Sequence, residues 1–490
     1  MDYKPQPSSP PRVQVQPRLI IHGGAGNITP ASLGPELYVA YRSSLLTIVS
    51  KAHAYLTTPT QSGYNSTSFD SPKLPSALEA ATYAVTLLED NPLFNSGHGA
   101  VFTRDGINEL EASVMVSRGQ AKRGVGVTGL RHVRNPILLA KKILEHGRDD
   151  LLGRGKKLDN NNGNTEPDVP SAQGHTLIHG PTAEKLARQY GLEMVDPSYF
   201  FTQKRWDEHI RALEREKREQ QNMLGTDATI VGVSATWSKD EYLPQGTVGA
   251  VALDAEGVIC AATSTGGMTN KLTGRIGDTP VVGAGFWAEE WTEDGDPTSP
   301  HKNGSRNPLY NPGPAVVLSD VLKGLIADCL PSPFLCSPAL QRSFGGLTTT
   351  RSIGVSGTGN GDSFFRVAAA RTVGAIARYS SLPSAVALTK VAGPSGELQK
   401  SADDRWGKAG EGEGGIIGLE LVVVRDANGN VVETRSEILQ DHNCGGMFRA
   451  WIDEEGVAYA RIFREDQDIP SSYIGEGRPE DPRVWSGEKI

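Results

Sequence analysis

Three short motifs in the middle of the chain carry the residue types best suited to chemistry. Gly246 and Thr247 begin the stretch GTVGAVALD, Thr265 lies in ATSTGG, and Arg275 and Asp278 lie in GRIGDTP. A threonine hydroxyl is a weak nucleophile near neutral pH unless a base is adjacent, whereas a free α-amine, with a pKa of about 7.7 to 8.0, is partly neutral there. Cleavage of the peptide bond before Thr247 would therefore give this residue its own base.

The residues around this bond suit such a cleavage, although each has a plainer interpretation. We expect Gly246 to tolerate strained dihedrals that let the Thr247 hydroxyl attack the Gly246 carbonyl. The alternative for Thr247 is an ordinary strand residue whose hydroxyl is satisfied by its neighbours. Thr265 is predicted to return beside Thr247 and to hydrogen-bond its amine; the alternative is a hydroxyl that caps the Thr-Gly-Gly turn.

Arg275 and Asp278 offer opposite charges three residues apart in a glycine-flanked turn. This pair suits a zwitterion, because a guanidinium can bind an α-carboxylate in bidentate fashion while a carboxylate accepts hydrogen bonds from an α-ammonium. The alternative is that the two side chains pair with each other or lie in water, as many surface ion pairs do.

With these motifs the chain resembles the N-terminal-nucleophile hydrolases of the plant-type asparaginase and isoaspartyl peptidase family. The resemblance implies an α+β fold, a four-layer αββα sandwich, here with long polar surface insertions. It also implies a threonine amidohydrolase that cuts itself into residues 1–246 and 247–490 and hydrolyses L-asparagine, β-aspartyl peptides or both. The segments that carry the resemblance are IIHGGAGNI (20–28), LEDNPLFNSGHGAVFTRDGINELEASVM (88–115), NPILLAKKILE (135–145), GTVGAVALD through GAGFWA (246–288) and VSGTGNGD (355–362).

The resemblance assigns roles to residues of this chain. Thr247 is the nucleophile, Thr265 orients it, and Thr358 and Gly359 stabilise the oxyanion. No cofactor is required, but a structural sodium ion bound through main-chain oxygens is implied for the 88–98 loop, and the active form is expected to be a dimer of processed heterodimers. The remaining implied residues are Arg275, Asp278, Asn95 and Gly361 for the substrate, and Leu88, Glu89, Phe94, Ser96 and His98 for the ion.

The pattern of apolar residues and turn signals predicts the elements that position these residues. Apolar residues recur at helical spacing over 37–56, and Ser76 with Glu79 forms a capping box that opens a helix toward residue 88. Strands are predicted at 18–22, before a glycine turn at 23–26, and at 247–253, 258–264 and 416–425, of which the middle two form a hairpin.

Composition excludes several classes of protein. The 490 residues carry a net charge of −8 with both signs interspersed, so no basic face for nucleic acid is expected. No apolar run is long enough for a membrane span, and the proline-rich stretch 1–17 lacks the apolar core of a secretory signal. We therefore expect a cytoplasmic protein with a disordered tail at 1–17 and one domain at 18–490. The four cysteines contain no CxxC pair and indicate neither disulfides nor zinc.

Polar, glycine- and proline-rich runs at 57–75, 153–173, 291–314 and 394–414 are predicted to be surface loops. A long insertion, residues 289–351, separates the Arg275 and Asp278 motif from Thr358. Because both its ends approach the expected pocket, we hypothesise that it forms a lid or narrows the entrance and so biases the enzyme toward or away from peptides.

Several rival interpretations remain at this point. The GxGxxG match at 124–129 precedes a strand-like segment and not a helix, which argues against a dinucleotide site. His22 and His98 lack the spaced partners of a metal site and are expected to be structural. Glycosylasparaginases share the TGNGD segment, threonine endoproteases of the taspase type share the nucleophile, and an unprocessed binding module could share the fold without activity.

Overall fold

The protein is described by a computed structural model that covers residues 15–59, 73–152, 171–223, 246–295, 346–380, 382–408 and 410–487. Most of the predicted N-terminal tail lies outside these residues, as do most of the predicted loops 57–75, 153–173 and 291–314. The central part of the hypothesised lid, residues 296–345, also lies outside them.

The chain divides into two compact units. The smaller comprises Met1–Pro11, Thr292–Thr350 and Val423–Thr434, and the larger comprises Arg12–Trp291, Arg351–Val422 and Arg435–Ile490. Within the smaller unit, the Gly295 N–H donates to the Leu347 carbonyl at 2.9 Å. All of the predicted site residues belong to the larger unit, so the site can be described within that unit alone.

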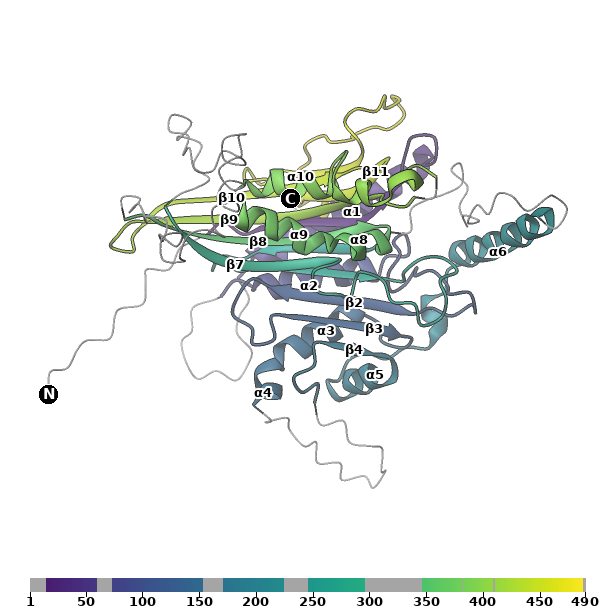
Figure 1. The fold of residues 1–490 in the computed structure, drawn as a ribbon, viewed down its shortest axis with the longest axis horizontal. Coiled ribbons are helices and arrows are strands. Elements are labelled where there is room, and N and C mark those ends of the chain that lie inside the picture. Colours follow the sequence, from purple (N-terminus) through teal and green to yellow (C-terminus); the bar gives the residue numbers. More distant parts are fainter. Residues whose placement is uncertain are drawn as a thin grey trace, which may run out of the picture. The chain divides into compact units, whose positions relative to one another are not determined.

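Among the described residues, the larger of two sheets contains eight strands. Its central strands β5 and β6 form the predicted antiparallel hairpin, with Val248 opposite Ser264 and Leu253 opposite Ile259. Both are buried along their whole length, as expected for strands covered on two faces. The order across this sheet is β12 (Ala458–Phe463), β11 (Gly446–Ile452), β1 (Arg18–Gly26), β5 (Val248–Leu253), β6 (Ile259–Thr265), β2 (Leu110–Val116), β3 (Gly124–Leu130) and β4 (Leu177–His179). Figure 1 shows β2, β3 and β4 in succession.

The smaller sheet among the described residues contains the four strands β10 (Val431–His442), β9 (Gly414–Arg425), β8 (Thr348–Gly359) and β7 (Phe286–Asp294), in that order. Strand β8 touches the larger sheet within the larger unit. The His22 ring on β1 lies 2.7 Å from the Ser356 hydroxyl on β8, and a Cβ on Gly354 would lie 2.4 Å from the Ile259 side chain on β6. Residues of the two sheets therefore face each other there.

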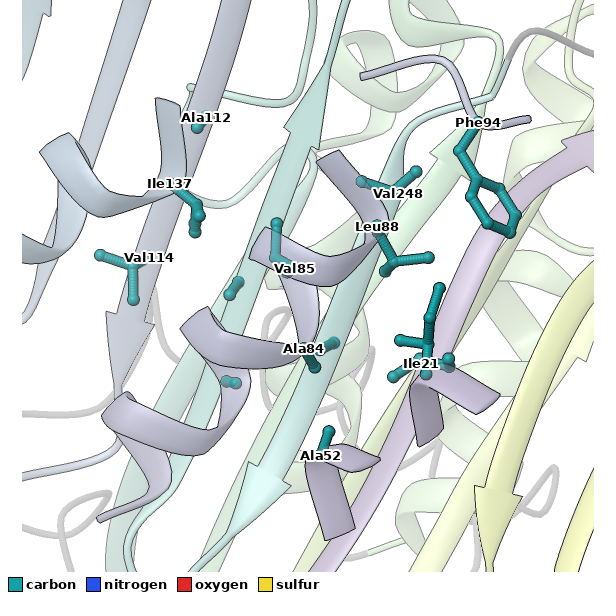
Figure 2. Packing of buried hydrophobic residues seen from close by; sticks show 14 of the residues in the cluster. Ile21, Ala52, Ala84, Val85, Leu88, Phe94, Ala112, Val114, Ile137 and Val248 are labelled. Atoms are coloured by element: carbon teal, nitrogen blue, oxygen red, sulfur yellow. The ribbon is translucent and has the colours of Figure 1, made fainter. Parts of the chain in front are cut away.

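Helices cover the larger sheet and bury its apolar side chains. Helix α1 (Pro35–Thr57) packs on β11 and β1, α2 (Ala77–Glu89) on β5 and β6, and α3 (Pro136–Glu145) on β2 and β3. Figure 2 shows Val85 and Leu88 of α2 beside Val248 and Ile21 of the sheet. Burial of each such side chain contributes about 1.5 to 3 kcal/mol, which holds the helices against the strands that carry the site.

A second apolar cluster joins the smaller sheet to a group of helices. Phe364, Val373 and Leu388 of these helices are buried with Ile353 and Val355 of β8. The helices are α8 (Gly361–Val367), α9 (Ala369–Tyr379), α10 (Ser384–Ala392) and α11 (Glu397–Ser401). The other described helices are α4 (Gly147–Leu151), α5 (Gly180–Gln189), α6 (Gln203–Met223) and α12 (Pro482–Ser486), with short 3₁₀ turns at Pro197–Phe200 and Asp403–Arg405.

Several predicted elements are confirmed. The capping box is present, since the Ser76 hydroxyl accepts from the Glu79 N–H while the Glu79 carboxylate accepts from the Ser76 N–H. The helix at 37–56 and the strand at 416–425 are α1 and β9, each slightly longer than predicted. The GxGxxG match lies wholly within strand β3, so its glycines open no helix. Cys260 and Cys444 are buried and free; Cys329 and Cys336 lie outside the described residues.

Two predictions of local structure are wrong. The glycines at 23–26 do not form a turn but continue β1, which shifts register between His22 and Gly24 and still pairs with β11. Their lack of side chains serves close approach, because a Cβ on Gly24 would lie 3.2 Å from the Gly246 Cα. The predicted loop 394–414 contains α11, which forms because Leu398 is fully buried against the helical cluster.

Candidate active site

Thr247 lies at the entrance of β5, immediately before the first residue of the strand. Its side chain is buried, and its hydroxyl oxygen lies 3.0 Å from the hydroxyl oxygen of Thr279. Thr279 directly follows Asp278 in the GRIGDTP motif. The structure therefore brings the proposed nucleophile against the segment that carries the predicted substrate residues.

Gly246 is held in a space that admits no side chain. A Cβ at this position would lie 2.4 Å from the Gly24 Cα, 2.6 Å from the Thr358 hydroxyl and 2.8 Å from the Ala25 nitrogen. Gly246 is not among the described glycines with positive φ, so the expected strained dihedral is not observed. Glycine is needed here for close packing, because its Cα lies between strand β1 and the Thr358 hydroxyl.

Thr265 ends β6 on the far side of the hairpin. The register pairs Val248 with Ser264, so continuing it by one residue places Thr265 opposite Thr247. The Thr265 hydroxyl accepts from the Gly267 N–H at 3.0 Å. Both interpretations of Thr265 are thus compatible with its position, because the hydroxyl caps the turn while the residue lies across from the nucleophile.

Thr358 and Gly359 lie where β8 ends and α8 begins. The Thr358 hydroxyl is fully buried, and no hydrogen-bond partner for it exists among the described residues. Gly359 has φ +146°, and a Cβ there would lie 2.4 Å from the Glu413 carbonyl oxygen. An unpaired hydroxyl in the interior is costly, and a donor aimed at developing negative charge is what an oxyanion site requires.

The charged part of the site, which we call the clamp, consists of Arg275, Asp278, Glu111 and Asp362. Arg275 donates to Asp362 at 3.0 Å, whereas the Asp278 Oδ2 is buried without a hydrogen-bond partner among the described residues. The recorded ion pair of Arg275 is thus with Asp362 and not with Asp278. The clamp thus contains one cation and three carboxylates, and the charge of the neighbouring Lys271 acts on Glu111 and Arg275.

Burial changes the chemistry of Asp278. Desolvation raises its pKa to about 7, although the positive charge of Arg275 acts in the opposite direction; the charges of Glu111 and Asp362 raise the pKa further. The pKa of this carboxyl group therefore lies near neutral pH, and its Oδ2 atom has no hydrogen-bond partner among the described residues. Gly361 lies against the same carboxyl group, since a Cβ there would lie 2.7 Å from the Asp278 Oδ1.

Sequence reasoning missed three residues of the site, namely Glu111, Thr279 and Asp362. Glu111 is buried on β2 opposite Thr265, and its carboxylate accepts from the Gly277 N–H at 3.1 Å. It therefore fixes the glycine turn of the clamp. Its signal was a carboxylate near the start of a strand that is otherwise apolar except for Ser113, because ionised groups are rarely buried without a partner.

Asn95 supports the turn that follows Thr265. Its side-chain nitrogen donates to the Gly267 carbonyl at 2.7 Å, and its side-chain oxygen accepts from the Val101 N–H at 3.0 Å. The main chain of Asn95 also accepts from the Gly266 N–H at 3.0 Å. These bonds fix the segment between the nucleophile and the clamp.

The 88–98 loop, predicted to hold a sodium ion, brings several main-chain oxygens together. A Cβ on Gly99 would lie 2.7 Å from the Pro92 oxygen and 2.8 Å from the Phe94 oxygen. The Leu88 carbonyl accepts from the N–H groups of Asp90 and Asn91, and the Glu89 carbonyl accepts from the His98 N–H and keeps a second lone pair. These hard oxygen donors fit an alkali cation. Among the described residues, no three His, Cys, Asp or Glu side chains lie together as a metal site.

The side chains of this loop tie it to strand β6. The Ser264 hydroxyl donates to the Glu89 carboxylate at 2.7 Å and lies 2.6 Å from the Ser96 hydroxyl. Desolvation raises the pKa of Glu89 to about 8. The His98 ring bonds the Tyr199 carbonyl at 2.6 Å, which agrees with its expected structural role.

His22 lies beneath the nucleophile and is kept neutral by burial. Desolvation lowers its pKa to about 3, and its ring lies beside the Thr247 backbone and 2.7 Å from the Ser356 hydroxyl. The predicted structural role of this histidine fits that environment, because a neutral ring with a lowered pKa is a weak base.

No helix of the described residues is long and apolar enough to cross a membrane.

Comparison with known proteins places the chain among amidohydrolases. An isoaspartyl peptidase of Escherichia coli is 37% identical over 270 residues, which cover 55% of this chain and 67% of that protein. A plant-type L-asparaginase of Pyrococcus furiosus is 34% identical over 279 residues, which cover 56% of this chain and 70% of that protein.

The family model described as asparaginase matches residues 15–157 and 168–292. The match therefore includes Thr247, Thr265, Arg275 and Asp278, while Thr358 and Gly359 lie beyond it. Because the matched residues make up more than half of the sequence, this chain belongs to the asparaginase family.

Proposed function

We propose that this protein is a threonine hydrolase that cuts its own chain before Thr247 and then hydrolyses L-asparagine, isoaspartyl peptides or both. Family membership and relatives named isoaspartyl peptidase and plant-type L-asparaginase support this activity. The observation that carries the proposal is the junction itself. Thr247 follows a glycine packed against an unpaired Thr358 hydroxyl, and Thr247 touches the segment that holds the clamp.

The proposed reaction proceeds through an acyl-enzyme. The Thr247 hydroxyl attacks the side-chain carbonyl of the aspartyl group while the freed α-amine of Thr247 takes the hydroxyl proton. The Thr358 hydroxyl and the Gly359 N–H stabilise the tetrahedral oxyanion. The amine returns the proton to the leaving ammonia or peptide amine, and water then hydrolyses the ester to release aspartate. Thr265 lies across from Thr247 and orients the amine.

The clamp selects the aspartyl end of the substrate. Arg275 binds the α-carboxylate and Asp278 accepts from the α-ammonium, whose charge offsets the excess of carboxylates around Arg275. Gly361 leaves the space that this end of the substrate occupies, and Asn95 holds the turn beside it. Burial strengthens both interactions, because charges attract more strongly where water is excluded.

The finer architecture forms part of the same proposal. Helices on the larger sheet, contacts between β8 and that sheet, and helices clustered with β8 support an αββα sandwich. We infer one domain at 18–490 after a disordered tail at 1–17, fragments 1–246 and 247–490, and a dimer of such pairs. We also infer a sodium ion held by main-chain oxygens of the 88–98 loop. The cytoplasmic location remains a prediction.

The purified full chain tests this function. Denaturing gel electrophoresis and intact mass should show two fragments, the second beginning at Thr247, and the mixture should release ammonia from L-asparagine or cleave a β-aspartyl dipeptide. Thr247→Ala should leave one intact band without turnover. A wild-type chain that stays uncut and inactive on both substrates would overturn the proposal, and turnover by an uncut chain would exclude the N-terminal amine as the base.

A further inference from the structure

The hydroxyl of Thr247 has one recorded hydrogen-bond partner among the described residues, the hydroxyl of Thr279 at 3.0 Å. Both side chains are buried, with Thr279 only 1% exposed. A threonine side chain can adopt several χ1 rotamers, and each would aim the reactive oxygen in a different direction. The contact with Thr279 favours one of these directions.

Thr279 is itself held by contacts with small hydroxyl residues on neighbouring strands. The Ser113 hydroxyl on β2 donates to the Thr279 carbonyl at 2.6 Å, and the Thr263 hydroxyl on β6 lies 3.4 Å from the same oxygen. Ser113 and Thr263 are register partners and also bond to each other. Main-chain bonds from Val281 and Gly285 to the Asp278 carbonyl hold the residue before it. The position of Thr279 is therefore set by the sheet.

We propose that Thr279 is a positioning residue that sets the rotamer of the Thr247 hydroxyl, both for cleavage of the chain and for turnover. This inference rests on the proposed function of Thr247. A hydroxyl is too weak a base to take the proton, so Thr279 acts through orientation in both reactions; in turnover, the α-amine that cleavage has freed on Thr247 takes the proton. Because Thr279 directly follows Asp278, one short segment sets the spacing between the nucleophile and the substrate ammonium.

The alternative is that Thr279 is only a satisfied core hydroxyl. The two roles differ in what they change. Loss of a structural bond lowers the stability of the fold, whereas loss of a positioning bond lowers kcat and the rate of self-cleavage and leaves KM nearly unchanged. A misplacement of the reacting atom affects the chemical step more than substrate binding.

Three variants separate these roles. Thr279→Val keeps the shape and removes the hydroxyl, Thr279→Ser restores a hydroxyl, and Thr82→Val is the matched control. Thr82 is also a threonine with 1% exposure, but its hydroxyl bonds only main-chain oxygens of helix α2. For each variant, the half-time of self-cleavage, kcat and KM of the mature enzyme, and the thermal unfolding midpoint should be measured.

For Thr279→Val we expect kcat and the self-cleavage rate each to fall about tenfold, the worth of one neutral hydrogen bond, with KM within about twofold of wild type. Thr279→Ser should recover most of both rates, and Thr82→Val should lower only the unfolding midpoint. If the wild-type chain is processed and active but Thr279→Val retains both rates, or Thr279→Ser fails to restore them, the positioning role is wrong. An unprocessed, inactive wild type would instead refute the function on which it rests.

Discussion

The two ends of the candidate site are built from different kinds of side chain. The nucleophile end contains neutral groups in tight contact, and the clamp end contains one cation and three carboxylates. In the first, Gly246 admits no Cβ and the Thr358 hydroxyl has no partner among the described residues. In the second, burial moves the pKa of Asp278 to about 7. Changes at the nucleophile end should therefore act on rate through geometry, and changes at the clamp should act on binding and its pH dependence.

The largest effect should come from adding one methyl group at the nucleophile end. Gly246→Ala would place a Cβ 2.4 Å from the Gly24 Cα and 2.6 Å from the Thr358 hydroxyl, so the junction must move. We expect the precursor to persist and the activity to be lost with it, as followed by a time course on denaturing gels. Gly34→Ala is the control, because no atom lies within 4 Å of its added Cβ. Processing of Gly246→Ala at the wild-type rate would show that this packing is irrelevant.

Next in size is loss of the unpaired hydroxyl. Thr358→Val should lower kcat of the mature enzyme by about 10²- to 10³-fold, since that is the usual effect of removing one oxyanion donor. KM should change little, because the donor acts on charge that develops only in the transition state. Steady-state kinetics on purified, fully cleaved enzyme would check this. An equal rise in KM without loss of kcat would assign Thr358 to the clamp end.

A smaller effect with a different signature is expected at the clamp. Asp278 accepts a substrate ammonium only as a carboxylate, so kcat/KM should fall as pH drops through about 7, where the carboxyl gains its proton. Asp278→Asn should raise KM about 10- to 100-fold, the worth of a charge-assisted hydrogen bond, and remove this limb of the pH profile. Titration of the Thr247 amine should remain in kcat of both proteins. If kcat/KM of Asp278→Asn still falls as the pH drops through about 7, a group other than Asp278 titrates there.

The smallest effect should come from the exposed partner of Arg275. The Asp362 side chain is 68% exposed and pairs with Arg275 at 3.0 Å, so it competes weakly with the substrate carboxylate for the same guanidinium. Asp362→Asn should lower KM by no more than about threefold without altering kcat. A clear rise in KM would mean that Asp362 binds the substrate directly. Comparison at low and high salt would sharpen the result, because exposed pairs are screened.

Local signals in the sequence were sufficient to predict the helix and the hairpin that position the site. The capping box at Ser76 and Glu79 and the hairpin of β5 and β6 follow from residues a few positions apart, and both are present. The motifs also predicted roles for Thr247, Arg275 and Asp278, and the contact between Thr247 and Thr279 places Thr247 beside the segment that carries the other two.

The partners of these residues could not be predicted in the same way. Glu111, Thr279 and Asp362 acquire their positions from pairing between β2 and β6 and from the contact between α8 and Arg275, which are tertiary contacts. Gly246 illustrates the same limit. The sequence predicts that glycine is needed at this position for a strained dihedral. In the structure, glycine is needed because the neighbouring residues of β1 and β8 leave no room for a Cβ.

The close fit around Gly246 has a further consequence for how the enzyme becomes active. The proposed scission would leave a terminal carboxylate on this glycine, next to the Thr358 hydroxyl that we propose as the oxyanion donor. The new C-terminus at Gly246 then occupies the pocket, and it must leave this position before asparagine can bind. Catalysis should consequently lag behind the appearance of the two fragments.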